Sequence, residues 1–217
     1  MFTSSEENYL KAIYNLGLAA QKGVSTNAIA KKLDTKASSV TDMMKKLAEK
    51  KVLIYQKYRG VTLTVTGKKT AALIIRKHRL WETFLVEKLN FNWDEVHDVA
   101  EQLEHIKSQK LIDEIDVLLG FPIIDPHGDP IPDKTGNLHS ITKSLLSALS
   151  VNESAVFVGV EDSSSEFLQF LDKQHIALGN NIKVIHKEPF DDSLMIEVSE
   201  KIMTISNKTA NNLYIQK

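Results

Sequence analysis

The spacing of hydrophobic residues predicts a series of helices in the first part of the chain. Residues 4–20 carry an apolar stripe at helical spacing that closes on Gly17. Ser25 is expected to cap a second helix, because a serine hydroxyl accepts a hydrogen bond from the free N–H groups of a helix N-terminus. After the polar residues 34–36, a third helix should turn four apolar side chains inward, namely Val40, Met43, Met44 and Leu47.

Alternation replaces helical spacing after the third helix. The stretch "LIYQKYRGVTLTVT" predicts two strands around a turn at Arg59 and Gly60. Thr66 is expected to cap a long helix from about Gly67 to Leu89, and a further helix should carry "HDVAEQLEH", residues 97–105. Helix, short turn, helix and two-stranded hairpin is the order of a winged helix-turn-helix.

Proline and glycine mark a boundary in the second half of the chain. Four of the five prolines fall in "GFPIIDPHGDPIPDKTG", which predicts a linker over residues 120–140. Beyond it, "AVFVGVE", "NIKVIHKE", "LMIEVSE" and "LYIQK" predict short strands, with a helical turn at "SSEFLQFLDKQHI". The pattern therefore predicts an α+β chain with a winged helix at 1–66, a helical domain at 67–140 and a small β-barrel at 141–217.

The composition is that of a soluble globular protein, with 42% hydrophobic and 25% charged residues among 217. No run of about 18 apolar residues occurs, so we expect no membrane contact. The first twenty residues lack the apolar core of a signal peptide. The absence of cysteine excludes disulfides and thiolate metal sites, and it is consistent with a cytoplasmic protein.

The net charge of −1 conceals an uneven distribution. Residues 1–66 hold eleven Lys and Arg against five Asp and Glu, whereas residues 121–217 hold eight against thirteen. A basic first third on an acidic chain indicates a polyanionic partner, although a solvated lysine-rich surface has the same charge. Together with the winged-helix pattern, the charge favours double-stranded DNA as the partner.

The third helix is expected to enter the major groove. Small and polar residues at its start are suited to base edges, and basic residues in the helix and the hairpin to phosphates. The candidate base contacts are Lys36, Ser38, Ser39, Thr41 and Asp42. The candidate phosphate contacts are Lys45, Lys46, Lys57 and Arg59.

Two adjacent predicted helices each place histidine and glutamate beside apolar residues. On the first, His78 and Glu82 lie one turn apart on an apolar face. On the second, a rotation of about 100° per residue puts four ligand-type residues within an arc of roughly 100°, at the edge of the buried surface: His97, Glu101, Glu104 and His105. These side chains offer nitrogen and oxygen ligands for one or two metal ions.

Two explanations without metal remain open. A hydrogen bond between His78 and Glu82 would satisfy that pair, and the second group could be a solvated acidic face with incidental histidines. An enzyme is not expected. The stretch "EQLEH" departs from the His-x-x-Glu-His of inverted zinc hydrolases, and no nucleophile–base motif or phosphate-binding glycine loop occurs.

In combination, several motifs resemble the diphtheria-toxin-repressor family of metal-dependent transcriptional repressors. They are "KYRGVTLTVTGKK", "RKHRLWETFL", "VHDVAEQLEH" and "HGDPIP". The resemblance covers residues 4 to about 140 closely, and it implies that the helical domain is a dimerisation domain. Residues 145–217 resemble the SH3-like domain that many members carry, through the strand pattern and "ALGNNIKVI".

The resemblance also implies metal ligands. His78, Glu101, Glu104 and His105 fall on the family's regulatory site, with Asn8 as a further ligand. His78, Glu82 and His97 fall near an ancillary site, to which Asp162 or Glu166 of the third domain could contribute.

Two positions in the resemblance bear on the identity of the metal. Position 101 is cysteine in iron-responsive members and glutamate in manganese-responsive ones, and here it is Glu101. Position 8 is methionine or aspartate respectively, and here it is Asn8. A ligand set of oxygen and imidazole favours Mn²⁺, with Fe²⁺ as the alternative.

The implied function is repression of metal-uptake genes by a homodimer on palindromic operator DNA, without a small organic substrate. The alternative is a winged-helix regulator that answers another ligand or a partner, with the histidines and glutamates structural. Operator binding that survives a chelator would favour this alternative.

Overall fold

The computed structural model describes residues 2–20, 23–56, 59–138 and 141–217. The chain forms two compact units. The first consists of Met1–Trp81, Ala100–Leu118 and Ile131–His139, and the second of Glu82–Val99, Leu119–Pro130 and Ser140–Lys217. Among the described residues, none of the helices has the length and apolar character needed to cross a membrane.

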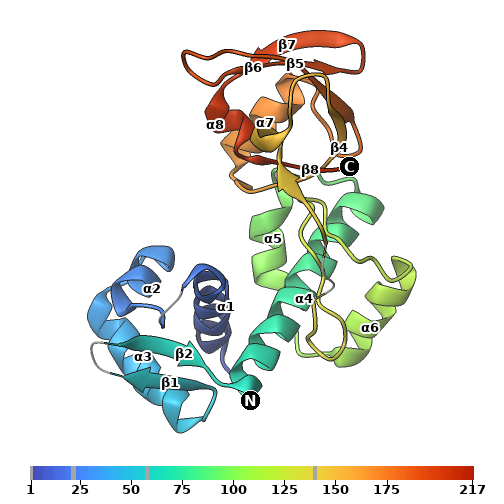
Figure 1. The fold of residues 1–217 in the computed structure, drawn as a ribbon. Coiled ribbons are helices and arrows are strands. Elements are labelled where there is room, and N and C mark those ends of the chain that lie inside the picture. The colour runs from blue at the N-terminus through green and yellow to red at the C-terminus, as the bar shows by residue number, and fades with distance from the viewer. Residues whose placement is uncertain (1, 21–22, 57–58, 139–140) are drawn as a thin grey trace. The chain divides into compact units, whose positions relative to one another are not determined.

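The first unit begins with the predicted winged helix-turn-helix (Figure 1). Its elements are α1 (Ser4–Ala19), α2 (Thr26–Lys32), α3 (Ala37–Glu49), β1 (Leu53–Gln56) and β2 (Gly60–Leu63). The predicted cap is confirmed, because the Ser25 side chain accepts the Ala28 N–H. The strands β1 and β2 pair antiparallel, with Leu53 opposite Leu63.

The apolar stripes that predicted the helices form the core of this winged helix. Leu10 and Ile13 of α1 pack with Met44 and Leu47 of α3 in one buried cluster. Each such buried side chain contributes about 1.5–3 kcal/mol relative to an exposed one. This packing joins α1 firmly to α3, the helix that the sequence analysis expects to enter the major groove of DNA.

The long helix α4 (Val65–Leu89) begins two residues earlier than predicted. Thr64, and not Thr66, provides the cap, because its hydroxyl accepts the Gly67 N–H at 3.1 Å. Gly67 is required at this point, since a Cβ there would lie 1.8 Å from the Val52 carbonyl oxygen. The first turn of α4 therefore packs directly against the backbone that enters β1.

Two shorter helices follow, α5 (Val96–Leu103) and α6 (Gln109–Leu118). The helix predicted over residues 97–105 thus ends at Leu103, although the Glu104 N–H still donates to Ala100. The sequence did not predict α6. A buried ion pair of 2.6 Å joins α6 to α4, from Arg76 to Asp116.

The proline-rich segment is ordered by its own aspartates. Asp125 Oδ1 accepts the N–H groups of His127 and Asp129, both at 2.9 Å. Asp133 Oδ1 accepts the N–H groups of Thr135 and Asn137 in the same way. Aspartate stabilises turns by accepting from the backbone two residues ahead. Composition predicted a linker here, and the described residues form two tight turns.

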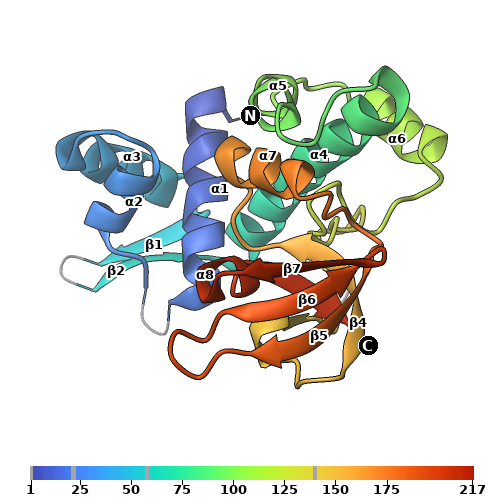
Figure 2. The same ribbon diagram turned by 90° about the horizontal axis from the view of Figure 1, so that it is seen from above.

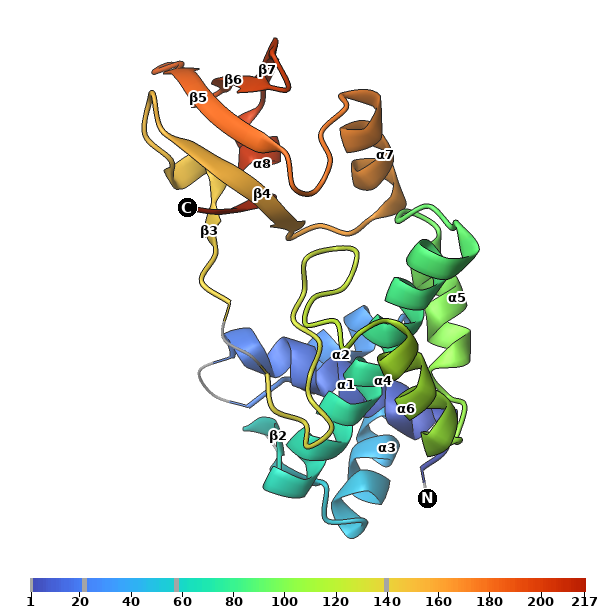
Figure 3. The same cartoon turned by 90° about the vertical axis from the view of Figure 1, so that its right-hand side faces the viewer.

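The second unit contains the predicted small β-domain (Figures 2 and 3). Its elements are β3 (Ser144–Leu145), η1 (Leu146–Ala148), β4 (Ser154–Val160), α7 (Ser165–Lys173), β5 (Asn181–Lys187), β6 (Leu194–Val198), β7 (Lys201–Ile205), α8 (Asn207–Ala210) and β8 (Leu213–Gln216). Its described strands are all antiparallel, in the order β3-β8-β4-β5-β6-β7, and they enclose a core around Phe157.

The sequence did not predict β7. It follows β6 through a tight turn in which Ser199 and Glu200 both have positive φ, 48° and 65°. Such turns usually carry glycine or asparagine, so the pair Ser-Glu is a weak turn signal. The helix α7, which buries Leu168 and Leu171, and the strands β4, β5, β6 and β8 lie where the apolar runs predicted them. The short elements β3, η1 and α8 were not predicted.

Candidate metal centre

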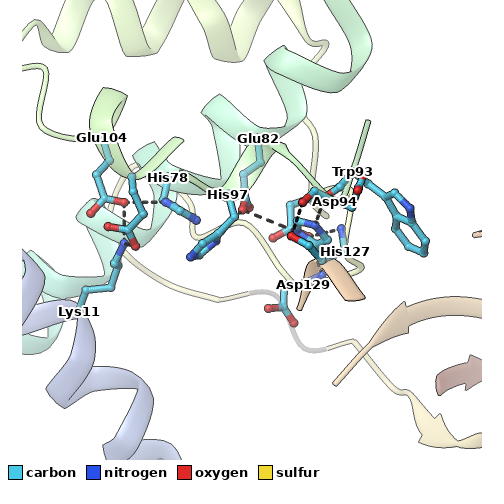
Figure 4. Close-up of polar contacts among 12 residues, drawn as sticks. Lys11, His78, Glu82, Trp93, Asp94, His97, Glu104, His127 and Asp129 are labelled. Carbon is cyan, nitrogen blue, oxygen red and sulfur yellow. Dashed lines mark hydrogen bonds and ion pairs between the residues drawn. The ribbon is translucent and has the colours of Figure 1, made fainter. Parts of the chain in front are cut away.

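The first unit brings residues of α1, α4 and the end of α5 together around one buried carboxylate. Glu104 is 0% exposed. Its Oε2 accepts hydrogen bonds from His78 Nδ1 at 2.6 Å and from Lys11 Nζ at 2.7 Å (Figure 4). A buried carboxylate is strongly destabilising unless it is paired and hydrogen-bonded, so these two donors are what allow Glu104 to be ionised.

The ionisation of Glu104 follows from this balance. Burial raises the pKa of its carboxyl, but the hydrogen bond from His78 and the charge of Lys11 outweigh burial, and the pKa is lowered overall. Lys11 also forms an ion pair with Glu101. One ammonium group from α1 therefore bonds to two carboxylates at the end of α5.

A second link between α1 and the end of α5 lies beside the first. Glu7 Oε2 accepts a hydrogen bond from His105 Nδ1 at 2.7 Å. The ammonium of Lys77 lies 4.0 Å from the same oxygen. The carboxylate of Glu7, which the sequence analysis did not single out, is therefore part of this cluster.

Two buried side-chain oxygens in the described part of this unit lack a hydrogen-bond partner. Asn8 Oδ1 and Glu104 Oε1 are buried, and no donor among the described residues bonds to either of them. Buried acceptors are nearly always satisfied, and an ion is one of the explanations when they are not. The surrounding donors are carboxylate, amide and imidazole groups, which suit a hard divalent cation. The residues present therefore fit a metal ion.

The second unit holds another group of potential ligands. Ligand atoms of Glu82, Asp125 and His127 all lie within 4.8 Å of one another, and all three side chains are buried. Glu82 Oε1 accepts a hydrogen bond from His97 Nδ1 at 3.3 Å and lies 3.7 Å from His127 Nδ1 (Figure 4). The Nε2 group of His127 donates to the Trp93 carbonyl at 2.8 Å, which directs Nδ1 towards the carboxylates.

The charge of this second group depends on His127. Burial by itself lowers the pKa of the imidazole, but the carboxylates of Glu82 and Asp125 raise it to about 9. His127 is therefore an imidazolium at neutral pH in the metal-free protein.

The loop that carries His127 requires glycine at position 128. The φ of Gly128 is +83°, and a Cβ there would lie 2.0 Å from the Val158 carbonyl oxygen.

The predicted ligands fall into both units. Asn8, His78, Glu101, Glu104 and His105 belong to the first, and Glu82 and His97 to the second. The sequence analysis placed the ligand-type residues of the second helix at the edge of the buried surface. In the structure, however, Glu104 is fully buried. Of the two residues offered from the third domain, Asp162 accepts the Ser164 N–H, and Glu166 is exposed on α7.

Sequence reasoning missed Glu7, Lys11, Asp125 and His127. Glu7 and Lys11 stand one residue before and three after Asn8, at helical spacing, which could have signalled a shared face. Asp125 and His127 stand in the proline-rich segment, where turn-forming composition concealed their chemistry.

The DNA-binding candidates lie on the exposed side of α3. Val40, Met44 and Leu47 face the core. The opposite side carries the predicted contacts, with Thr41 half-buried and the others exposed: Lys36, Ser38, Ser39, Asp42, Lys45 and Lys46. Arg59 is exposed in the hairpin, and Lys57 lies outside the described residues.

Comparison with protein families accounts for most of the chain. Residues 1–61 match the iron dependent repressor N-terminal DNA binding domain, and residues 64–133 match the iron dependent repressor metal binding and dimerisation domain. Residues 145–217 match the FeoA domain.

Individual relatives and structures agree with these matches. The HTH-type transcriptional regulator MntR of Oceanobacillus iheyensis is 40% identical over 121 residues, which is 56% of this chain and 81% of that protein. The iron-dependent repressor IdeR of Mycobacterium bovis is 33% identical over 128 residues, 58% of this chain and 54% of that protein. A solved manganese-dependent transcriptional repressor in complex with manganese is 32% identical, with a TM-score of 0.85, and the match covers 97% of this chain and 98% of that one.

A winged helix joined to a buried cluster of oxygen and imidazole donors defines a metal-dependent transcriptional repressor. The chain belongs to the iron-dependent repressor family, the diphtheria-toxin-repressor family that includes MntR and IdeR. Its members are DNA-binding regulators and not enzymes. The predicted fold class, with a winged helix, a helical dimerisation domain and an SH3-like β-domain, is confirmed.

Proposed function

We propose that this protein is a manganese-responsive repressor that binds a palindromic operator as a cytoplasmic homodimer and controls metal-uptake genes. The observation that carries the proposal is the pair of buried, unsatisfied oxygens, Asn8 Oδ1 and Glu104 Oε1, within a donor set that lacks sulfur. Hard oxygen and imidazole ligands favour Mn²⁺ and leave Fe²⁺ as the alternative. The manganese complex of a similar repressor supports the first choice.

In this proposal, the regulatory site consists of Asn8, His78, Glu101, Glu104 and His105, with Glu7 beside them. These residues would hold a divalent ion, which would supply positive charge to the carboxylates at the end of α5. Because Leu10 and Ile13 join α1 to the core that contains α3, ligands on α1 transmit their position to the DNA-binding surface. Glu82, His97, Asp125 and His127 form a second candidate site.

Two surface features support the proposed partners. The exposed side of α3 offers lysines for phosphates and small polar residues for base edges. On α6, the apolar side chains of Leu111, Val117 and Leu118 are exposed. Exposed apolar residues on one helix are typical of a protein interface, and here they support a dimer.

The test is a mobility-shift titration of the protein's own promoter at fixed salt with Mn²⁺, Fe²⁺, Zn²⁺ or EDTA. We expect tight binding with Mn²⁺ and loss of binding in EDTA, because the metal favours the arrangement that binds DNA. Glu104→Gln should abolish the metal dependence, whereas Glu200→Gln, an exposed control, should not change it. Operator binding of equal strength in Mn²⁺ and EDTA would contradict the proposal.

The identity of the metal has its own test. Glu101→Cys introduces a soft ligand, so the order of metals in the same titration should shift from Mn²⁺ towards Fe²⁺. An unchanged order would show that residue 101 does not decide the metal preference.

A further inference from the structure

Lys11 occupies an unusual position for a lysine. Its side chain is only 13% exposed, and its ammonium bonds to Glu101 and, at 2.7 Å, to the fully buried Glu104 (Figure 4). Lysine is seldom buried unless it is paired, and here both partners are residues of the proposed regulatory site. The side chain that neutralises these carboxylates is thus one of the chain's own cations.

We propose that the Lys11 ammonium is a resident cation of the regulatory site, and that a divalent metal ion must displace it in order to bind. This inference rests on the proposed function, because it takes Glu101 and Glu104 as metal ligands. Lys11, which lies on the same helix as Asn8, is in this view a competitor of the metal ion.

Lys11 and a metal ion would compete because both are positively charged and both need the same carboxylates. An ion such as Zn²⁺ binds a carboxylate oxygen at about 2.0–2.2 Å, so an ion on Glu104 Oε2 would lie at most about 5 Å from an ammonium that stays 2.7 Å from the same oxygen. Two positive charges at that separation repel strongly in a partly buried site. A protonated lysine has donors only and cannot become a ligand itself.

The competition has two consequences for the protein. In the metal-free state the ion pairs balance the charge of the carboxylates, so the site stays formed and α1 stays attached to the end of α5. In the presence of metal, part of the binding free energy is spent on breaking those ion pairs. The affinity is therefore lower than the ligand set alone would give, and the site fills only when the metal is abundant.

The first test compares Mn²⁺ binding by calorimetry and thermal unfolding of the full chain in four forms: the wild type, Lys11→Met, Lys11→Arg and Lys31→Met. Lys31 is an exposed lysine on α2 and serves as the matched control. Removing the competitor should tighten the Mn²⁺ Kd of Lys11→Met by about ten- to a hundredfold. The metal-free Tm of this variant should fall, because Glu104 loses a donor.

Lys11→Arg keeps the charge and both acceptors, so its Kd should stay near that of the wild type, as should that of Lys31→Met. A Kd for Lys11→Met that equals or exceeds the wild-type value would overturn the inference while leaving the proposed function intact. Absence of Mn²⁺ binding by the wild type would overturn both.

A second measurement uses the wild type alone and does not depend on the folding of a variant. Acylation of lysine side chains by an amine-reactive ester is followed by mass spectrometry, with and without Mn²⁺. Displacement should speed the labelling of Lys11 several-fold, while Lys31 reacts at the same rate in both conditions. Unchanged or slower labelling of Lys11 in saturating Mn²⁺ would overturn the inference.

Discussion

The cluster around Glu104 and the cluster around Glu82 hold similar ligand types, but a different cation balances each of them. Glu104 is paired with the ammonium group of Lys11 from α1. Glu82 lies beside the imidazolium of His127, which can release its proton and then offer a nitrogen lone pair. In our proposals, a metal ion enters the first cluster only if the Lys11 side chain moves, whereas the second cluster needs only to lose the proton of His127.

The comparison explains why ligand type alone does not describe a metal site. Carboxylates buried in a metal-free protein need a countercharge, and the chemistry of that countercharge sets what the metal must replace. Four changes test this contrast.

The largest effect is expected from Glu104→Ala. The substitution leaves Lys11 and His78 without their shared acceptor, and breaking a buried ion pair in this way costs about 3–5 kcal/mol. Urea unfolding of the metal-free protein measures the loss. Glu200→Ala, at an exposed turn, should change the free energy of unfolding by less than about 0.5 kcal/mol. If both substitutions lowered the free energy of unfolding by the same small amount, the ion pairs of Glu104 would not stabilise the protein.

The second effect is a pH dependence that belongs to the Glu82 cluster. The pKa of His127 is raised from 6.5 to about 9, so its contribution to stability is complete below pH 6.5 and is lost as the pH rises towards 9. We expect the metal-free wild type, in EDTA, to lose roughly 2–3 kcal/mol more than His127→Gln between pH 6 and pH 9. Denaturant titrations at the two pH values provide the measurement. Parallel losses in the two proteins would contradict the role given to His127.

A third change separates a structural carboxylate from a ligand. Glu6 is fully buried, and its Oε1 pairs with Lys50 at 2.7 Å and with Lys46 at 3.1 Å. Burial raises the pKa of its carboxyl, but these lysines and the Thr3 N–H lower it to about 2. Glu6→Gln keeps the capping interaction with Thr3 and loses the charge, at a cost of about 2 kcal/mol in unfolding experiments.

The Mn²⁺ affinity of Glu6→Gln should equal that of the wild type, because both Glu6 oxygens are occupied by donors within the winged helix. Glu49→Gln, exposed at the end of α3, is the control. A weakened affinity for Mn²⁺ in Glu6→Gln would extend the regulatory site to this residue.

The smallest effect on stability is expected for Asp42→Asn. Asp42 pairs with Lys45 at 3.3 Å on α3, where the two side chains are 78% and 64% exposed. Exposed pairs of this kind contribute less than about 1 kcal/mol. Thermal unfolding should therefore hardly change, whereas the affinity for non-operator DNA should rise as a negative charge leaves the proposed DNA surface. A large loss of stability would mean that this exposed ion pair stabilises the protein as much as the buried ones do.

The helices and strands could be predicted from sequence wherever local chemistry was decisive. The apolar stripe of α1, the Ser25 cap and the alternating hairpin all depend on residues within a few positions of one another. The predictions failed where local signals were weak, at α6 and at β7 behind its Ser199–Glu200 turn. The start of α4 was misplaced because Thr64 and Thr66 are equally good caps in sequence.

The ligand candidates Asn8, Glu101, Glu104 and His105 came from helical spacing and family resemblance, and their assignment as ligands stays a prediction. Their partners could not be found in that way. Glu104 and Lys11 are 93 positions apart, and His105 and Glu7 are 98 apart. Pairs of this kind form only when whole helices pack, because no short-range rule relates their positions.

Three features of the protein could be predicted from its residues alone: a basic winged helix, a cysteine-free set of histidine and carboxylate side chains, and a separate β-domain. These follow from periodicity and composition, which act through neighbouring residues. Packing between distant segments determines which carboxylates are buried, which cation neutralises each of them, and that two buried oxygens receive no hydrogen bond from the described residues. Burial and pairing arise from the packing of distant segments, and they control charge because an ion's free energy depends on everything that surrounds it.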